Sequence, residues 1–372
     1  MPKLIRGVFE GGGAKGSAFV GALRALDEMG IWFSAVAGTS AGSITAAPIA
    51  AGYTASEIAA LSDPSSPTRV DFGAFKDRGW APWIALGTCW GSAAAEAIGS
   101  LTSGLTGLDL GSWDDSLLNV SAAAGCLLCT GGFAWLATML RRLHWDGGWF
   151  LGNAFREWMR RLLRAKLGLD RDVVFRDLGT LPGTIPLTVV ACDLNPVNYR
   201  TRVIYFNEKN TPDFPVHVAV RASMSIPLMF TTVRVGFGYP GKAYNSDLVD
   251  GGVLSNLPLD CFANKLGNIG KDVFGFLLDE GPPDPKTLSW LVPTLARLQT
   301  AVHAMRTYHD SLMQTKYADQ VVRLPTLGVR TGQFRLDSAT FRKLNSTSYE
   351  VTRHHPGLMQ FAAAVVAPGG RS

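Results

Sequence analysis

The sequence predicts an α/β protein of three layers, α/β/α, with helices on both faces of a central, mostly parallel sheet. Two observations support this fold class. Residues 1–60 alternate short apolar runs with helical patterns, and the same alternation returns after residue 180. Strands that alternate with helices form parallel sheets, because a parallel connection is long enough to hold a helix. With 372 residues, 47% of them hydrophobic, the chain can build one large or two unequal domains.

The first part of the predicted core is a strand from Leu4 to Phe9 that ends in a glycine-rich turn. A helical pattern then continues through Met29, and Phe33 to Ala37 predicts the second strand. A further helix begins at Ala41, directly after a second glycine-containing turn. This order predicts two parallel strands joined by a helix.

The second part of the core lies after residue 180 and follows the same order. Its strands are expected at Ile185 to Cys192, Val203 to Phe206, Leu248 to Val249 and Val273 to Leu278, with a helix around Val216 to Met224. Long helical patterning from Leu288 to Tyr317 follows. We therefore expect one domain over residues 1–280, with its core at 1–60 and 181–280, and a C-terminal helical extension over 281–372 that packs on this core.

Residues 61–180 predict an insertion, rich in tryptophan and largely helical, that covers the core. Eight of the ten tryptophans fall between Trp80 and Trp158, and no Lys or Arg occurs from Gly79 to Leu140. Long excursions from a rigid scaffold are commonly active-site lids, so we interpret this insertion as a cap or lid.

Two segments of this insertion could meet a membrane. Ser116 to Leu140 is uncharged and long enough to span a bilayer, although its Gly, Ser, Asn and Thr content favours a buried or interfacial helix. Residues 152–168 predict a basic amphipathic helix, which fits either an ordinary surface helix or one that docks on anionic lipid headgroups. Its apolar face holds Phe155, Trp158, Met159, Leu162 and Leu163, and its basic face holds Arg156, Arg160, Arg161 and Arg164.

Charge and cysteine content restrict the partners and the compartment. The formal charge of +5 is too mild to argue for nucleic acid, but it suits an anionic membrane surface. The five cysteines are odd in number and the N-terminus lacks a secretory signal pattern. We expect the cytoplasm, or export by a route that needs no such signal, with peripheral membrane association. Cys126 and Cys129 have metal-ligand spacing without a second pair nearby, so we expect buried thiols and no metal or cofactor.

A glycine loop is the first motif that indicates chemistry. It stands between a predicted strand and a helix, where backbone N–H groups can converge on a negative charge. A dinucleotide site would need an acidic residue at the end of the second strand, which instead reads Ala37-Gly38-Thr39-Ser40. A phosphate loop would need Gly-Lys-Ser/Thr, and that pattern is absent here. The loop consists of Gly11, Gly12, Gly13, Ala14, Lys15 and Gly16.

The second motif is Gly38-Thr39-Ser40-Ala41-Gly42, a G-x-S-x-G pattern at a strand-to-helix turn. Such a turn is typical of a nucleophile elbow, in which the serine hydroxyl stands above the sheet and the glycines avoid collisions. A helix N-cap would explain Ser40 without explaining both Gly38 and Gly42.

A serine nucleophile needs a base, and the third motif offers a carboxylate. None of the histidines lies in a glycine-flanked loop after a strand, so we expect structural or solvated roles for His144, His217, His303, His309, His354 and His355. Asp250-Gly251-Gly252 directly follows the apolar pair Leu248-Val249, and a carboxylate followed by two glycines can approach another loop closely. Alone, this motif would read as an ordinary Asp-Gly turn.

Taken together, GGGAKG, GTSAG and DGG resemble the patatin-like phospholipase family in order and placement. ASMSIPLMF, from Ala222 to Phe230, and DGGVLSNLP, from Asp250 to Pro258, are similar to further segments of that family. The resemblance covers about Leu4 to Tyr53 and Pro186 to Leu278, and it excludes the tryptophan-rich insertion and the C-terminal hundred residues.

This resemblance implies a patatin-like fold and a Ser-Asp dyad without histidine. Ser40 would be the nucleophile and Asp250 the base, while N–H groups of the glycine loop, chiefly Gly12 and Gly13 with Ala14 as a further candidate, would form the oxyanion hole. Lys15 would orient the loop, attract anionic headgroups or simply be solvated. The pH profile of the rate should lack a histidine-type inflection between about pH 6 and 7 unless desolvation raises the pKa of Asp250 that far.

The function expected from these motifs is a lipid acyl hydrolase of the phospholipase A or lysophospholipase type, acting on phospholipids or other acyl lipids at a membrane surface. A thioesterase or acyltransferase would use the same dyad, and a catalytically silent membrane-associated module is a third alternative. The sequence identifies neither an activating partner nor the regioselectivity and headgroup preference.

Overall fold

The computed structural model describes residues 3–67, 141, 146–195, 202–239, 242–279, 311, 314–333 and 335–366. The chain divides into two compact units. The larger contains Met1–Phe75, Gly152–Pro227 and Thr232–Ser372, and the smaller contains Lys76–Leu151 and Leu228–Thr231. In the described part of the smaller unit, β3 (Gly148–Phe150) pairs in parallel with β6 (Leu228–Phe230). Most of the expected tryptophan-rich insertion, including Ser116 to Leu140, Cys126 and Cys129, lies outside the described residues.

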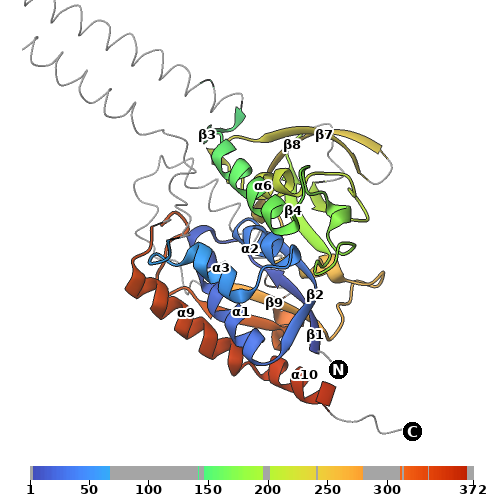
Figure 1. Cartoon of the computed structure of the whole chain (residues 1–372). Helices are drawn as coiled ribbons and strands as arrows, with labels where there is room; N and C mark the ends of the chain where they lie inside the picture. The colour runs from blue at the N-terminus through green and yellow to red at the C-terminus, as the bar shows by residue number, and fades with distance from the viewer. Residues whose placement is uncertain are drawn as a thin grey trace, which may run out of the picture. The chain divides into compact units, whose positions relative to one another are not determined.

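A central sheet of eight described strands organises the larger unit (Figure 1). Its order is β10-β9-β1-β2-β4-β8-β7, with β5 paired to β4. Neighbours from β10 to β4 run parallel, whereas β4 pairs antiparallel with β5 and β8, and β8 with β7. The strands are β1 (Lys3–Phe9), β2 (Ile31–Thr39), β4 (Leu187–Asp193), β5 (Val203–Phe206), β7 (Val233–Tyr239), β8 (Lys242–Asp250), β9 (Val273–Asp279) and β10 (Val321–Pro325).

Helices flank this sheet and complete the expected three-layer α/β/α architecture. As the pattern of alternating elements predicts, α2 lies against β2 and α7 against β4; α1 also contacts the C-terminal helix α9. The helices are α1 (Phe19–Glu28), α2 (Ala41–Ala50), α3 (Ala55–Ser62), α6 (Asn153–Leu167), α7 (Val216–Ser223), α9 (Ser338–Arg353) and α10 (Pro356–Val366). The predicted α/β fold class, with a mostly parallel sheet, is confirmed.

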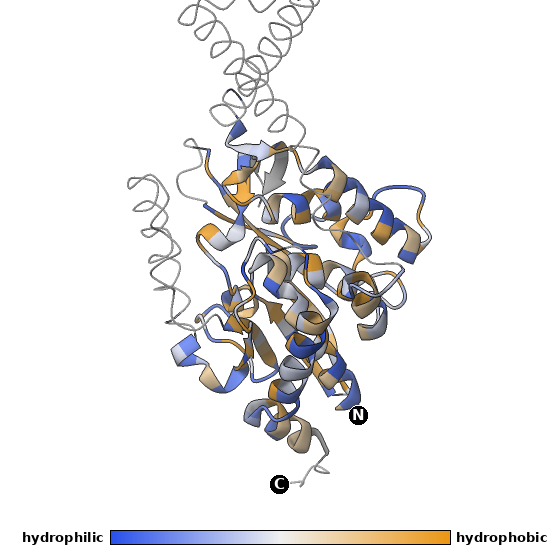
Figure 2. Ribbon diagram, turned by 90° about the vertical axis from the view of Figure 1, so that its left-hand side faces the viewer, coloured by the Kyte–Doolittle hydropathy of each residue, from blue (hydrophilic) through white to orange (hydrophobic). Residues whose placement is uncertain are grey.

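The interior strands are nearly continuous apolar runs, as expected for strands covered on both faces. All of β4 is buried, as is β9 except for its last residue, and hydrophobic residues gather on the sheet (Figure 2). At the end of β1 the Phe9 ring stacks on Phe276 with centroids 5.1 Å apart and meets Phe19 edge-on at 5.2 Å. This aromatic packing fixes the point at which the glycine loop begins.

Several elements differ from the sequence prediction. The glycine loop leads first into a short 3-10 helix, Gly13–Ala18, and only then into α1. The strand expected at Leu248 to Val249 is the end of the nine-residue strand β8, which forms a hairpin with β7. Alternation such as Val-Arg-Val in β7 marks a strand with one face packed, and the prediction did not use it.

The C-terminal segment also contributes a strand, which the predicted helical extension did not include. β10 pairs in parallel with β9 and extends the sheet. After it, Asp337 caps α9 by accepting the N–H groups of Ala339 and Thr340 at 3.0 and 2.9 Å. Since α9 packs on both α1 and β10, these C-terminal residues form part of the core layer structure.

The predicted amphipathic helix is α6, and its apolar face packs into the larger unit. Phe155, Met159 and Leu163 are buried, and the helix contacts α7. On the basic face, Arg160 pairs with Asp172 at 2.6 Å, and Lys166 next to that face pairs with Glu57 at 2.8 Å. α6 is thus a surface helix with part of its positive charge already paired; docking on lipid stays a prediction.

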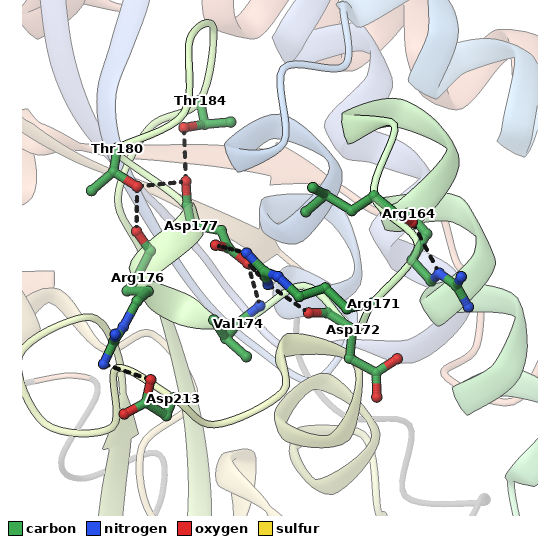
Figure 3. A network of polar contacts seen from close by, with 10 residues as sticks. Arg164, Arg171, Asp172, Val174, Arg176, Asp177, Thr180, Thr184 and Asp213 are labelled. Carbon is green, nitrogen blue, oxygen red and sulfur yellow. Dashed lines mark hydrogen bonds and ion pairs between the residues drawn. The ribbon is translucent and has the colours of Figure 1, made fainter.

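Asp177 ties together the connection between α6 and β4 (Figure 3). Its carboxylate accepts two hydrogen bonds from the Arg171 guanidinium, both 2.7 Å, and the Val174 N–H at 2.9 Å. Its backbone carbonyl accepts from the hydroxyls of Thr180 and Thr184, both at 3.3 Å. The bond to Arg171 lowers the pKa of Asp177 despite its burial, so this carboxylate stabilises the fold at neutral pH and loses that contribution as pH falls through its depressed pKa.

Asp177→Ala is expected to destabilise the protein by about 1–3 kcal/mol, because the partly buried Val174 N–H and the Arg171 guanidinium lose a charged acceptor. Asp213→Ala is the matched control. Asp213 also pairs with an arginine of this network, Arg176 at 2.5 Å, but its side chain is 73% exposed, so its loss should cost less than about 1 kcal/mol. Urea unfolding of both variants measures the difference, and equal costs would contradict this account.

Candidate active site

Ser40 occupies a strained turn between β2 and α2. Its φ of 50° and ψ of −120° lie in a region that non-glycine residues rarely adopt. The Ser40 carbonyl accepts the N–H groups of Ser43 at 2.9 Å and Ile44 at 3.1 Å, which starts α2 immediately after the turn. Strain at the last residue before a helix is the geometry expected of a nucleophile elbow.

The glycines that flank Ser40 are required by close backbone packing. A β-carbon at Gly42 would overlap the Phe9 carbonyl at the end of β1, and one at Gly38 would overlap the backbone of Gly42. These two glycines therefore let β1, β2 and α2 meet at the turn, which agrees with the reason given for them from the sequence.

The last residue of α7 and the turn that follows it hold both predicted catalytic residues by their backbones. The Ser223 hydroxyl accepts the Ser40 N–H at 2.9 Å and donates to the Val190 carbonyl at 2.6 Å. Two residues later, the Ser225 carbonyl accepts the Asp250 N–H at 2.9 Å. Ser223 and Ser225 are both fully buried. The structure thus brings Ser40 and Asp250, 210 positions apart in sequence, to one short segment.

Asp250 stands at the end of β8 and begins the DGG turn. Its Oδ1 accepts the Gly252 N–H at 2.7 Å, which fixes one carboxylate oxygen. Gly251 lies against β2 and β4: a β-carbon there would overlap the Val190 carbonyl and lie 3.1 Å from the Thr39 methyl group. Ser40 and Asp250 are each only 6% exposed, so their immediate surroundings are largely desolvated.

The glycine loop lies directly beside Ser40. A β-carbon added at Gly11 would be 3.0 Å from the Ser40 β-carbon. Within the loop, Gly11 N–H donates to the Asn256 carbonyl, Ala14 N–H to the Thr331 carbonyl and Lys15 N–H to the Gly12 carbonyl. Among the described residues, the N–H groups of Gly12 and Gly13 have no such acceptor. Ala14 is thereby engaged elsewhere, whereas Gly12 and Gly13 retain donors for a ligand.

Lys15 belongs to the buried part of this loop. Lys15 is 4% exposed, so the alternative of a simply solvated lysine is wrong, and the other two alternatives stay predictions. No group of three or more potential metal ligands occurs within the described ranges, and no helix there has the length and apolarity needed to cross a membrane.

Comparison with known proteins identifies the family. Residues 7–263, well over half of the chain, match the family model described as patatin-like phospholipase. The chain belongs to the patatin-like phospholipase family. The glycine loop, the elbow and the DGG turn all lie within the matched residues, and membership supports a lipid-hydrolysing esterase.

Relatives of this patatin-like protein include one curated sequence of similar length. The uncharacterized protein YqhO of Bacillus subtilis (strain 168) is 29% identical over 339 residues, covering 89% of this chain and 91% of YqhO. Solved structures that resemble this chain include VipD from Legionella pneumophila, with 17% identity and a TM-score of 0.45 over 98% of this chain and 67% of VipD. The type III effector ExoU of Pseudomonas aeruginosa has 18% identity and a TM-score of 0.43 over 97% of this chain and 54% of ExoU. The chain thus spans about half the length of ExoU.

Two polar residues beside the patatin-like site were missed by sequence reasoning. Glu10 and Asn256 are buried, and an amide–carboxylate hydrogen bond joins them across 246 positions of sequence. Both stand at the predicted motifs: Glu10 directly precedes GGGAKG, and Asn256 lies within DGGVLSNLP. A glutamate directly after an apolar strand and before three glycines was the available signal, because a charge at the end of a core strand needs specific partners.

The three histidines that the structure describes lie on α7 or directly after α9. His217 lies on α7, where burial lowers its pKa and nearby Asp172 partly opposes that shift. His355 is half-buried with its Nε2 3.2 Å from the Val321 carbonyl, and His354 is exposed. His144, His303 and His309 lie outside the described residues.

His217 is expected to influence stability and not the rate. Since its pKa is lowered on folding, the neutral form is favoured in the native state, so stability is full above about pH 6.5 and falls as pH drops below it. His217→Gln should lose less thermal stability between pH 7.5 and 5.5 than wild type does, with an unchanged rate profile from about pH 6 to 7. An inflection in the wild-type rate that disappears in His217→Gln would show that histidine, not Asp250, is the base.

Proposed function

We propose that this protein is a phospholipase of the phospholipase A or lysophospholipase type that hydrolyses fatty acyl esters through a Ser40–Asp250 dyad. The observation that carries this proposal is the strained Ser40 at the β2–α2 turn, with the glycine loop against its β-carbon. A strained serine beside free backbone donors suits acyl transfer, because nucleophile and oxyanion donors must converge on one carbonyl.

In the first half of the reaction, Ser40 Oγ attacks the ester carbonyl carbon while Asp250 accepts the hydroxyl proton. The carbonyl oxygen becomes an oxyanion that the Gly12 and Gly13 N–H groups stabilise, and the tetrahedral adduct then expels the alcohol of the lipid, which takes the proton from Asp250. In the second half, Asp250 takes a proton from water, whose oxygen attacks the carbonyl carbon of the acyl-Ser40 ester. The tetrahedral adduct then breaks its bond to Ser40 Oγ, which takes the proton back from Asp250, and the fatty acid is released.

Burial of the dyad supports this assignment of Asp250. An exposed aspartate is a weak base, but desolvation favours its protonated form and so favours proton transfer from serine. The nearby Cys192 is not an alternative nucleophile, because burial raises the pKa of its thiol to about 12 and keeps it protonated.

Fatty-acid release from lipid vesicles tests the proposed substrate. Vesicles of phosphatidylcholine and phosphatidylglycerol, a soluble monomeric ester and an acyl thioester are each given to the protein, and the products are identified by mass spectrometry. We expect free fatty acid and lysophospholipid from the vesicles, at higher rates than from the monomeric ester, as for an enzyme that acts at a membrane surface.

Other outcomes point to the alternative functions. Hydrolysis of the thioester without hydrolysis of the vesicle phospholipids would make the protein a thioesterase. Transfer of the acyl group to a second alcohol would make it an acyltransferase. A lack of turnover on every substrate would favour a binding module and contradict the proposal.

A further inference from the structure

Glu10 and Asn256 form a buried polar cluster that the mechanism above does not use. Glu10 is 6% exposed and Asn256 is 1% exposed. Burying a carboxylate and an amide is costly unless their polar atoms are bonded, so the contacts that they make indicate what they do.

Asn256 forms hydrogen bonds with both the carbonyl and the N–H group of Gly11. Its side-chain Nδ2 donates to the Gly11 carbonyl at 3.0 Å and to Glu10 Oε1 at 2.6 Å, while its backbone carbonyl accepts the Gly11 N–H at 3.2 Å. Both contacts of the amide nitrogen are acceptors, which fixes the orientation of the amide.

Glu10 anchors this asparagine to the sheet. Its second oxygen, Oε2, accepts the Leu278 N–H of β9 at 2.6 Å, and its own N–H donates to the Phe276 carbonyl at 3.1 Å. The carboxylate therefore bridges strand β9 and the Asn256 side chain, and it fixes the amide that grips Gly11.

The hydrogen bond from Asn256 to the Gly11 carbonyl determines where the Gly12 N–H points. In a planar trans peptide, the carbonyl of Gly11 and the N–H of Gly12 project to opposite sides, so a bond to one orients the other. Glycine on both sides of this peptide would otherwise let the plane turn freely. With the carbonyl turned toward Asn256, the Gly12 N–H is directed away from it.

Asn256 also lies against the DGG turn that begins with Asp250. Its Oδ1 would be 2.5 Å from a β-carbon at Gly11 and 2.6 Å from one at Gly252. The adjacent Ser255 carbonyl accepts the Thr39 hydroxyl at 3.0 Å, next to the nucleophile. One side chain therefore lies between the loop of the oxyanion donors and the loop of Asp250.

We propose that Glu10 and Asn256 are positioning residues that orient the Gly12 N–H toward the developing oxyanion. This inference rests on the proposed function, since it assigns the role within the same hydrolytic site. It predicts that loss of the Asn256 amide weakens transition-state stabilisation and leaves substrate binding unchanged.

The test compares Asn256→Ala and Glu10→Gln with wild type, using ester hydrolysis and inhibition by a trifluoromethyl ketone, whose adduct with serine carries an oxyanion. A misdirected donor should lower kcat by about 10–100-fold, less than complete loss of an oxyanion donor, which costs about 100–1000-fold. KM should stay within about twofold, and the inhibition constant of the ketone should rise in step with the fall in kcat/KM. Glu10→Gln, which keeps one acceptor oxygen, should show a smaller effect of the same kind.

Controls separate positioning from general damage and from failure of the proposed function. Asn264→Ala, in an exposed loop, makes the same chemical change and should alter neither quantity. A ligand with an ether in place of the ester should bind all variants equally, because it forms no oxyanion. Folded variants with wild-type kcat and ketone inhibition would overturn the inference while the hydrolase stands, whereas an inactive wild type would refute the function itself. If Asn256→Ala does not fold, Glu10→Gln decides alone by the same measurements.

Discussion

Ser40→Ala is expected to lower kcat for acyl ester hydrolysis by at least about 10⁴-fold, because it removes the proposed nucleophile of the acyl-enzyme. The fold should persist, since the bonds that define the turn use backbone atoms of Ser40, its N–H to Ser223 and its carbonyl to Ser43. Initial rates on phospholipid vesicles, with thermal unfolding as the check on folding, measure both effects.

Two further variants make this prediction specific. Ser56→Ala, at an exposed position on α3, is the matched control and should keep the wild-type rate. Ser40→Gly should be as inactive as Ser40→Ala but more stable than it by roughly 1 kcal/mol, because glycine adopts a φ of 50° without strain. Activity of Ser40→Ala above about one hundredth of wild type would contradict the role of nucleophile.

Asp250→Asn is expected to lower kcat by about 10³–10⁴-fold, a loss comparable to that seen when a catalytic aspartate is replaced by its amide. The amide cannot accept the Ser40 proton, but its oxygen can still accept the Gly252 N–H that Asp250 Oδ1 now binds at 2.7 Å. The turn should therefore keep its geometry while the base is lost. Single-turnover hydrolysis measures the acylation step directly.

Asp247→Asn is the control for this substitution. Asp247 lies three positions earlier on the same strand and makes a partly exposed contact with Arg234 at 3.1 Å. Its replacement should leave kcat within about twofold, since an exposed ion pair contributes little. A similar loss of rate in both variants would mean that charge on β8, and not a base at Asp250, explains the effect.

Sequence reasoning succeeded where chemistry is local. The elbow around Ser40 depends on a strand, a strained residue and two glycines within five positions, and the structure has this arrangement. The fold class was predictable for a similar reason, because alternating strands and helices are read within short windows.

The sequence did not predict roles that depend on contacts between residues far apart in the chain. Ser223 accepts the Ser40 N–H across 183 positions and Asn256 meets Glu10 across 246, and nothing in the neighbouring sequence specifies such pairs. Strand β10 was missed because five residues after a long helical pattern carry little periodicity. The burial of Lys15 was not predicted, because burial is a property of the assembled loop.

The most direct test of the Ser40–Asp250 dyad is covalent labelling with a fluorophosphonate, followed by intact mass and peptide mapping. We predict one adduct per chain, located on Ser40, with labelling at least about 100-fold slower in Asp250→Asn, because the probe needs an activated serine. An adduct on another serine, or no adduct on a folded protein that still hydrolyses phospholipid, would contradict the dyad.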